Sequence, residues 1–208
     1  MNEGLDRNVA YYNENAQAFF QDTVQADMSR LYDEFLPLLP SGGHILDAGC
    51  GSGRDSLAFL QRGFEVTSFD ASEEMVRMSS DLTREAGGRP TLLMRFEEME
   101  DVAQYDGIWA CASLLHVPEG QMRDVMARLV RALKPGGVLF VSFKAGYGEM
   151  ERNGRVFTMV SPETLHSYMS GLPVEIMKMR ETQDVRSGRE GDRWVSGVFR
   201  RHTGSVPT

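Results

Sequence analysis

The fold of this chain follows from the stretch His44-Ile45-Leu46-Asp47-Ala48-Gly49-Cys50-Gly51-Ser52-Gly53-Arg54-Asp55. An apolar, β-prone run ends in the carboxylate of Asp47, three glycines follow at alternate positions, and the residues after them have the spacing of an amphipathic helix. Glycine allows such a loop to turn tightly and lets a ligand approach its backbone, while the amides at the start of the helix favour an anionic group. The stretch therefore predicts a strand, a ligand-binding loop and a helix.

A second strand is predicted at 64–70, and it also ends in an acid, Asp70. Asp70 lies about 20 residues beyond the glycines, where nucleoside-binding α/β folds place the carboxylate that accepts from ribose hydroxyls. The glycine spacing is G-x-G-x-G, so the third glycine comes one residue earlier than in the dinucleotide-binding pattern. This spacing disfavours a nicotinamide-dependent oxidoreductase. A structural alternative for Asp47 and Asp70 is that each caps a turn.

Composition limits the classes of protein to consider. The chain has 208 residues with a net charge of −8 and two cysteines. Its length suits one α/β domain, and its acidic balance argues against a nucleic-acid groove. The first residues lack the basic and apolar regions of a secretory signal, and no run is long enough for a membrane span. We therefore expect a cytoplasmic monomer or homodimer that acts on a small molecule, without nucleic-acid or membrane partners.

Hydrophobic periodicity predicts the rest of the fold. Helices are expected over 8–40, followed by a third strand at 91–96, a fourth at 106–112 and, after a turn at 134–137, a fifth at 138–143. The segments 146–149 and 152–155 are expected to be loops, and 174–185 with 193–200 an antiparallel hairpin. Strands that alternate with helices give a doubly wound, Rossmann-like, mostly parallel seven-stranded α/β sheet whose ligand lies at the carboxyl ends of the strands.

Four ordered motifs resemble those of the class I S-adenosylmethionine-dependent methyltransferases. They are Ile45-Leu46-Asp47-Ala48-Gly49-Cys50-Gly51-Ser52-Gly53, Asp70-Ala71-Ser72, Tyr105-Asp106-Gly107-Ile108-Trp109 and Leu133-Lys134-Pro135-Gly136-Gly137, and the resemblance covers about residues 40–145. Within the superfamily, 53–56 and 111–118 are most similar to the tellurite-resistance methyltransferases. The resemblance implies a single methyltransferase domain (1–208) with a helical lid (1–40), a cofactor-binding core (41–145) and a C-terminal substrate-side half (146–208).

The resemblance also implies a cofactor, S-adenosylmethionine, and a product, S-adenosylhomocysteine. The loop amides and Arg54 are expected to hold the methionyl carboxylate, Asp47 the ammonium group and Asp70 the ribose. Relatives often carry an aspartate after the third strand for the adenine, which this chain lacks, so Phe96 and Glu97 are expected to hold the adenine instead. The full set of expected cofactor-binding residues is Tyr12, Asp47, Gly49, Cys50, Gly51, Ser52, Gly53, Arg54, Asp70, Ala71, Ser72, Met75, Phe96, Glu97, Cys111, Ala112 and Ser113.

His116 is the candidate catalytic residue, because it follows the fourth strand and its reference pKa lies near neutrality. Methyl transfer is an in-line displacement, so a base is needed only when the nucleophile arrives protonated. The structural alternative is that His116 packs at the start of the next helix. The aromatic residues of 11–20 have two interpretations that the sequence supports equally: they dock on the core, or they form a lid that excludes water.

Two further groups of side chains carry hypotheses. Cys50 and Cys111 follow neighbouring strands and could form a soft-metal or metalloid site, although two thiols without histidines make a poor zinc site and no metal is expected. An anionic acceptor would need cations such as Lys144, Arg155, Arg186 and Arg189. The predicted activity is methyl transfer to a small acceptor, for which a metalloid oxyanion such as tellurite or a small thiol are candidates. The alternative is a sensor that binds the cofactor without turnover.

Overall fold

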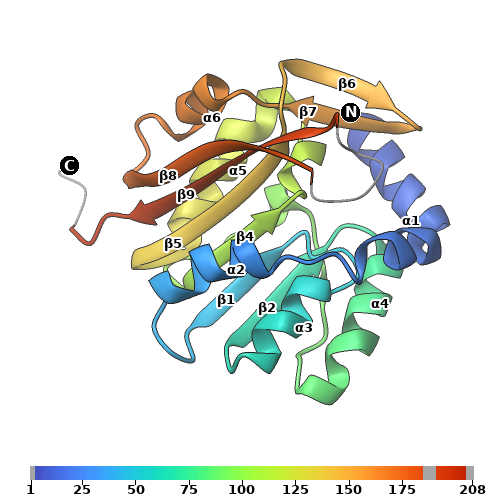
Figure 1. Cartoon of the computed structure of the whole chain (residues 1–208), viewed down its shortest axis with the longest axis horizontal. Coiled ribbons are helices and arrows are strands. Elements are labelled where there is room, and N and C mark those ends of the chain that lie inside the picture. Colours follow the sequence, from blue (N-terminus) through green and yellow to red (C-terminus); the bar gives the residue numbers. More distant parts are fainter. Residues whose placement is uncertain (1–2, 185–190, 205–208) are drawn as a thin grey trace.

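The computed structural model describes residues 3–184 and 191–204. In this part of the chain a seven-stranded sheet has the order β3-β2-β1-β4-β5-β9-β8 (Figure 1). Strands β1, β2, β3, β4 and β5 are parallel, while β9 runs antiparallel to β5 and β8 antiparallel to β9, which confirms the predicted sheet and C-terminal hairpin. The strands are β1 His44–Ala48, β2 Glu65–Asp70, β3 Leu92–Leu93, β4 Tyr105–Cys111, β5 Leu133–Lys144, β8 Val174–Gln183 and β9 Arg193–Arg201.

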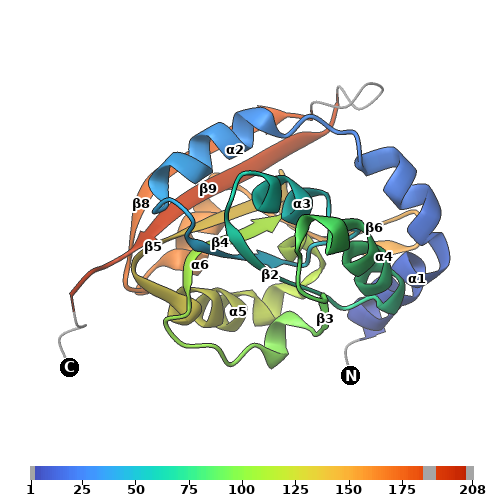
Figure 2. The same ribbon diagram turned by 90° about the horizontal axis from the view of Figure 1, so that it is seen from below.

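Helices cover both faces of this sheet. Figure 2 shows α2 and α5 on opposite sides of it. The helices are α1 Glu3–Thr23, α2 Ser29–Phe35, α3 Arg54–Gln61, α4 Glu73–Thr83, α5 Glu119–Ala132 and α6 Pro162–Met169, with short 3₁₀ turns η1 Leu36–Leu38, η2 Arg84–Ala86, η3 Phe96–Glu98 and η4 Leu114–His116. Of the described helices, none is long and apolar enough to cross a lipid bilayer.

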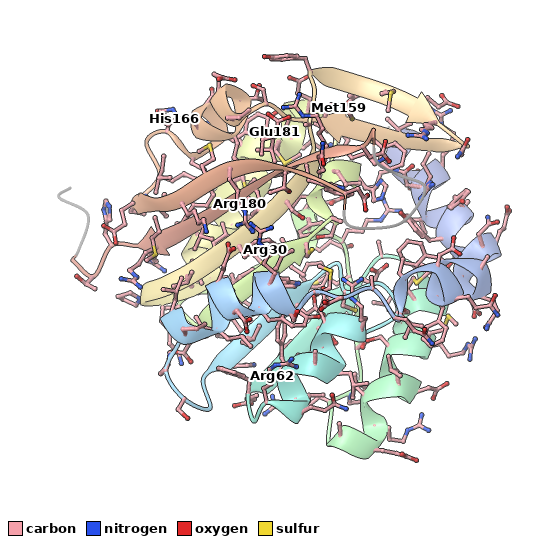
Figure 3. The ribbon with its side chains drawn as sticks, in the orientation of Figure 1. Arg30, Arg62, Met159, His166, Arg180 and Glu181 are labelled. Carbon is pink, nitrogen blue, oxygen red and sulfur yellow. The ribbon has the colours of Figure 1, made fainter. Side chains whose placement is uncertain are left out.

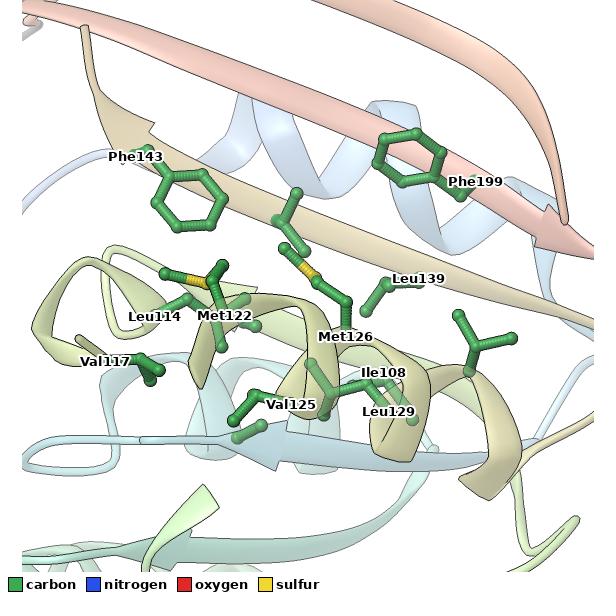
Figure 4. Close-up of a cluster of buried hydrophobic side chains, with 14 of the residues drawn as sticks. Ile108, Leu114, Val117, Met122, Val125, Met126, Leu129, Leu139, Phe143 and Phe199 are labelled. Atoms are coloured by element: carbon green, nitrogen blue, oxygen red, sulfur yellow. The ribbon is translucent and has the colours of Figure 1, made fainter. Parts of the chain in front are cut away.

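The core lies in two layers, one on each face of the sheet. On one face, methionine and aliphatic side chains of α5, including Met122 and Met126, pack against Phe143 and Phe199 (Figure 4). On the other face, Trp109 stacks on Phe140 with ring centroids 4.1 Å apart. Each fully buried side chain of this size contributes about 1.5–3 kcal/mol to folding. This packing holds the strands in register, so that their carboxyl ends meet at one edge.

The N-terminal segment is helical, as predicted over 8–40, but the helical part begins earlier, at Glu3, and is interrupted after Thr23. It forms two helices, because α1 ends at Thr23 and α2 begins at Ser29. α1 itself is kinked at Asn15, whose backbone is non-helical (φ −112°, ψ 15°) and whose side-chain amide donates to the carbonyl of Tyr11 at 2.9 Å. A side chain that binds the backbone of its own helix competes with the helical hydrogen bonds. With this kink, α1 packs on both α4 and a later strand, β7 (Arg155–Met159).

The region 146–155, predicted as loops, is a hairpin of β6 Gly148–Arg152 and β7 Arg155–Met159. Its turn is Asn153-Gly154, with φ values of +53° and +74°, which suits the type I′ turn of a two-residue hairpin. The third strand is also shorter than the predicted 91–96, because a capping box at Arg95 starts η3. The predicted turn at 134–137 lies inside β5, where the register with β4 shifts.

Candidate active site

Two adjoining cavities lie at the carboxyl edge of the sheet. The larger has a volume of about 620 Å³ and the smaller about 100 Å³. The residues that line both cavities come from α1, the glycine loop and the segment after β4: Tyr12, Phe19, Gly49, Gly51, Ala112 and His116. The predicted motifs therefore converge on one place, under α1.

The three glycines of the loop have different structural roles. A Cβ on Gly49, whose φ is +70°, would lie 2.5 Å from Cβ of Ser113, and one on Gly53 would lie 2.5 Å from Oγ of Ser79. Packing within the protein therefore excludes a side chain at these two positions. A Cβ on Gly51 would lie 3.5 Å from the ring of Phe19, at ordinary contact distance, so no such overlap restricts this position. Gly53 lines neither cavity, and its backbone caps α3.

The smaller cavity lies between the ends of β1, β2 and β4. Asp70 is at its centre, where Oδ2 accepts from the backbone N–H of Gly51 and Oδ1 from that of Ser72, both at 2.9 Å. Asp70 thus does cap a turn, yet each carboxylate oxygen keeps a second lone pair for another donor. Burial raises its pKa, and the two backbone donors act against that rise. The other expected residues on these walls are Ala71, Ser72, Met75, Phe96, Glu97 and Ser113.

Asp47 lines the larger cavity and is only 2% exposed. Its Oδ2 accepts from the Ser56 hydroxyl at 2.6 Å, and no Lys, Arg or His of the described ranges lies within ion-pair distance. Burial, together with the nearby charge of Asp55, raises the pKa of Asp47 to about 8. A buried carboxyl group without a counter-ion is a site that a cationic group would stabilise in its charged form.

Arg54 also lines the larger cavity, but its guanidinium is held by the neighbouring Asp55. Nε lies 2.7 Å from Oδ1 and Nη2 3.0 Å from Oδ2, and Nη1 donates to the carbonyl of Thr23 at 3.2 Å. Asp55 accepts further from Tyr32 at 2.5 Å and Trp109 at 2.8 Å. Although burial acts to raise the pKa of Asp55, Arg54 and these donors hold it below its usual range. The main role of Arg54 in this structure is therefore its ion pair with the buried Asp55.

His116 lies at the junction of the two cavities, in contact with Tyr12. Its Nε2 is 2.8 Å from the Tyr12 hydroxyl, and its Nδ1 is 3.2 Å from the carbonyl of Val156 and 3.1 Å from Nδ2 of Asn8. With the proton on Nδ1 directed to Val156, Nε2 is free to accept from Tyr12. Burial, together with the nearby Arg155, lowers the pKa of His116 to about 4, so the imidazole is neutral at pH 7.

The two cysteines, Cys50 and Cys111, both line the larger cavity. Burial raises the pKa of Cys111 to about 12 and that of Cys50 well above its usual value, so both thiols are protonated at neutral pH. Cys111 Sγ lies 3.5 Å from the hydroxyl of Ser142. Among residues 3–184 and 191–204, no group of three or more His, Cys, Asp or Glu side chains is placed to hold a metal ion.

The far wall of the larger cavity comes from the C-terminal half of the chain. Of the cations expected there, Lys144 and Arg155 line it, while Arg186 and Arg189 lie outside the described residues. The sequence reasoning did not single out Arg180, Phe157 or Trp194, which also line this wall, nor Arg30, which lies near Arg180 (Figure 3). The alternation Arg180, Thr182 and Trp194, Ser196 along the predicted hairpin was the available signal, since alternate residues share a face of a strand.

Comparison with known proteins agrees with this geometry. Residues 45–137 match the family model of a methyltransferase domain. A ubiquinone biosynthesis O-methyltransferase of Xanthomonas axonopodis pv. citri (strain 306) is 32% identical over 110 residues, which is 50% of this chain and 44% of that protein. The chain spans a little under half the length of the first curated relatives it matches.

Solved structures match over a longer part of the chain. The 1,6-didemethyltoxoflavin-N1-methyltransferase of Burkholderia thailandensis, solved with S-adenosylhomocysteine, has a TM-score of 0.76 at 21% identity and matches 95% of this chain and 88% of that one. TehB from Haemophilus influenzae has a TM-score of 0.69 at 17% identity, over 85% of this chain and 63% of that one. The chain therefore has the methyltransferase fold, and its residues 45–137 match a methyltransferase domain.

Proposed function

We propose that this protein is an S-adenosylmethionine-dependent methyltransferase of a small-molecule acceptor. The observation that carries the proposal is the pair of cavities that meet at Gly51, with a buried carboxyl group in each. S-adenosylmethionine has a nucleoside part and a cationic amino-acid part, which match the smaller and the larger cavity in this order. The methyltransferase domain match over 45–137 supports the same conclusion.

The residues present fit the cofactor. Asp47 is a buried carboxyl group with a raised pKa and no counter-ion of the described chain, so an ammonium group beside it would restore its charged form. Asp70 keeps lone pairs for ribose hydroxyls, and Phe96 and Met75 provide an apolar wall for an adenine ring. The amide of Ser52, which has no hydrogen-bond partner among the described residues, and the two uncommitted N–H groups of Arg54 belong to residues that line the larger cavity and are available to the methionyl carboxylate.

When bound, S-adenosylmethionine supplies an electrophilic methyl group on a sulfonium sulfur. The chain contributes positioning and exclusion of water. Helix α1 covers the site with Tyr12 and Phe19, and its Asn13 accepts from the Ser72 hydroxyl at 2.7 Å. Asp6 of α1 also pairs with Arg95 at 2.6 Å. These contacts tie the N-terminal lid to the cofactor-binding core, as the proposed division of one domain into lid (1–40), core (41–145) and substrate-side half (146–208) requires.

His116 serves as the general base through Tyr12. The Tyr12 hydroxyl accepts from Arg155 at 3.3 Å and donates to Nε2 of His116. An acceptor hydroxyl or thiol in the larger cavity gives its proton to the Tyr12 oxygen while the Tyr12 proton moves to Nε2. The bound cofactor would supply the methyl group that the deprotonated acceptor takes up, with S-adenosylhomocysteine as the leaving group, and Tyr12 and His116 would hold the displaced proton. Arg155, 3.3 Å away, stabilises negative charge on the Tyr12 oxygen during this relay.

The acceptor must be small, because the larger cavity of about 620 Å³ also holds the amino-acid part of the cofactor. A metalloid oxyanion or a small thiol are the candidates that the resemblance of 53–56 and 111–118 supports. We infer a cytoplasmic monomer or homodimer that uses no nucleic acid. The alternative, a sensor that binds the cofactor without turnover, is supported by the burial of His116, which lowers its strength as a base.

Calorimetric titration with S-adenosylmethionine, S-adenosylhomocysteine and NADH tests the proposal. We expect micromolar binding of the two adenosyl compounds, no binding of NADH, and weaker adenosyl binding by Asp70→Ala. Asp81→Ala, at an exposed ion pair with Arg77, is the matched control and should bind like the parent. Absence of adenosyl binding would refute the proposal. Binding without any methylated product across a broad acceptor panel would identify the sensor.

A further inference from the structure

Five cationic side chains of the described residues line the larger cavity, namely Arg30, Arg54, Lys144, Arg155 and Arg180. Four of them have a carboxylate partner. Asp55 holds Arg54, and Glu34 holds both Arg180 at 2.5 Å and Arg30 at 3.9 Å. Lys144 lies 3.5 Å from Asp192. Each of these four side chains thus has a carboxylate within ion-pair distance, although Glu34 also pairs with Lys178 and Asp192 with Arg152.

Arg155 is the exception. No carboxylate of residues 3–184 and 191–204 lies within 4.0 Å of its guanidinium, and its Nε is buried without a hydrogen-bond partner. Its hydrogen bond is to the Tyr12 hydroxyl, 3.3 Å from Nη1. The guanidinium carbon lies 4.5 Å from the ring centroid of Tyr11, 5.8 Å from that of Tyr12 and 5.2 Å from that of Phe157. Three aromatic rings thus hold a cation at the cavity wall.

This environment is incomplete for a guanidinium. Stacking on aromatic rings stabilises the cation, but it leaves the buried N–H donor unsatisfied. The natural complement of the planar fork is an oxyanion, because a carboxylate or phosphate accepts from two of its N–H groups at once. The protein as a whole is acidic, with a net charge of −8. An arginine without a nearby carboxylate, such as Arg155, is therefore not what its overall charge would produce.

We propose that Arg155 binds an anionic group of the methyl acceptor, and that the acceptor is a small organic molecule carrying a carboxylate or phosphate a few bonds from its nucleophilic atom. This inference rests on the proposed methyltransferase function. The anionic group must lie only a few bonds from the nucleophilic atom of the acceptor, because Arg155 Nη1 lies 3.3 Å from the Tyr12 oxygen that receives the acceptor's proton. The rings of Phe157 and Trp194 line the same cavity and suit an apolar, flat acceptor body.

The position of Arg155 separates this role from cofactor binding. The larger cavity holds both Arg155 and the residues proposed for the amino-acid part of the cofactor, but they come from different elements: Arg155 belongs to β7, and the glycine loop follows β1. Arg155 donates to the Tyr12 hydroxyl, which in turn contacts His116. An oxyanion on Arg155 would therefore lie beside Tyr12, the residue proposed to receive the acceptor's proton.

The first test is calorimetry with benzoate, benzamide and inorganic phosphate, on the protein alone and saturated with S-adenosylhomocysteine. We expect benzoate to bind about tenfold more tightly than its neutral amide, because only the carboxylate can pair with the fork. In Arg155→Met the preference falls to about twofold or less, and in Arg155→Lys, which keeps the charge without the fork, it is intermediate. Arg180→Met, which removes a cavity arginine that Glu34 already neutralises, keeps the preference. Phosphate binding in place of benzoate binding identifies a phosphate-bearing acceptor.

The second test is turnover with salicylate and salicylamide, which place a hydroxyl next to an anionic or a neutral group. We expect release of S-adenosylhomocysteine to favour salicylate by about tenfold in kcat/KM, and Arg155→Met to abolish this preference through KM. Equal binding of benzoate and benzamide by the parent together with no binding of phosphate, or an unchanged anion preference in Arg155→Met, overturns the inference. The inference is also overturned if Arg155→Met binds S-adenosylmethionine more weakly but keeps the preference for benzoate over benzamide. That result would mean that Arg155 binds the cofactor. If the parent protein binds neither S-adenosylmethionine nor S-adenosylhomocysteine, the proposed function is refuted instead. The titrations of benzoate and benzamide into the protein alone then still test the anion site.

Discussion

The Tyr12 hydroxyl lies 2.8 Å from Nε2 of His116, which joins two residues 104 positions apart in the chain. Tyr12 belongs to α1 and His116 to the segment after β4, so the contact links the lid to the end of the central strand. Arg155 donates to the same hydroxyl from β7. A side chain from each of three separate segments thus meets at one oxygen atom, at the junction of the two cavities.

We predict that His116→Gln lowers turnover by about 10²–10⁴-fold, because the acceptor's proton then has no base to receive it. The dissociation constant of S-adenosylmethionine should stay unchanged, since the imidazole is assigned to the acceptor step. Tyr12→Phe interrupts the same relay, so the double variant should lose no more turnover than the worse single variant. Single-turnover rates measure this. Equal turnover of His116→Gln and the parent would rule out the base.

We predict that His116 makes the protein less stable in acid. Its pKa is about 4 in the folded protein and about 6.5 when unfolded, so the unfolded state binds a proton first as the pH falls. This stability is fully present above pH 6.5 and is lost as the pH drops to 4, by about 1.4 kcal/mol per pH unit within that window. Urea unfolding at several pH values should show a shallower loss in His116→Gln, but not in His202→Gln, which changes an exposed histidine. Identical slopes for parent and His116→Gln would contradict the assignment.

We predict that cofactor binding releases a proton from Asp47. With a pKa of about 8, Asp47 is mostly protonated at pH 7 in the free protein, and an ammonium group beside it favours the charged form. Affinity for S-adenosylmethionine should therefore rise between pH 6 and 7.5, by up to about tenfold per pH unit. Calorimetry in buffers of different ionisation enthalpy counts the protons. Asp47→Asn should bind more weakly and without this pH dependence, whereas Asp27→Asn, exposed at the same cavity, should keep it.

Local sequence patterns were enough to predict the sheet and the position of its motifs. Apolar runs marked the strands, and the glycines with Asp47 and Asp70 marked the edge where the cavities lie, because these signals depend on neighbours within one segment. The β6–β7 hairpin was missed although Asn153-Gly154 is a strong turn signal, since β6 carries exposed charged residues in place of an apolar face.

Contacts between distant segments could not be predicted in this way. The sequence suggested a free Arg54 for the cofactor's carboxylate, yet its partner Asp55 also receives hydrogen bonds from Tyr32 and Trp109, which come from other elements. The pairing of Arg180 with Glu34, and the absence of a described carboxylate beside Arg155, likewise depend on how the hairpins fold back over α1 and α2. Such pairings are set by tertiary packing, which no periodicity encodes.

We predict that Asp55→Ala is strongly destabilising. Asp55 is 6% exposed and accepts four hydrogen bonds from Tyr32, Trp109 and Arg54, so its removal leaves the guanidinium of Arg54 without its partner. Breaking a buried pair from one side costs about 3–5 kcal/mol. Denaturant unfolding measures the loss, with Asp81→Ala as the control at a surface pair, where about 0.5 kcal/mol is expected. Asp55→Asn keeps the shape but not the charge and should fall between the two, because its single amide oxygen still accepts from one of Tyr32 and Trp109 but the amide no longer neutralises Arg54. A loss in Asp55→Ala as small as that in Asp81→Ala would mean that solvent reaches Arg54 freely.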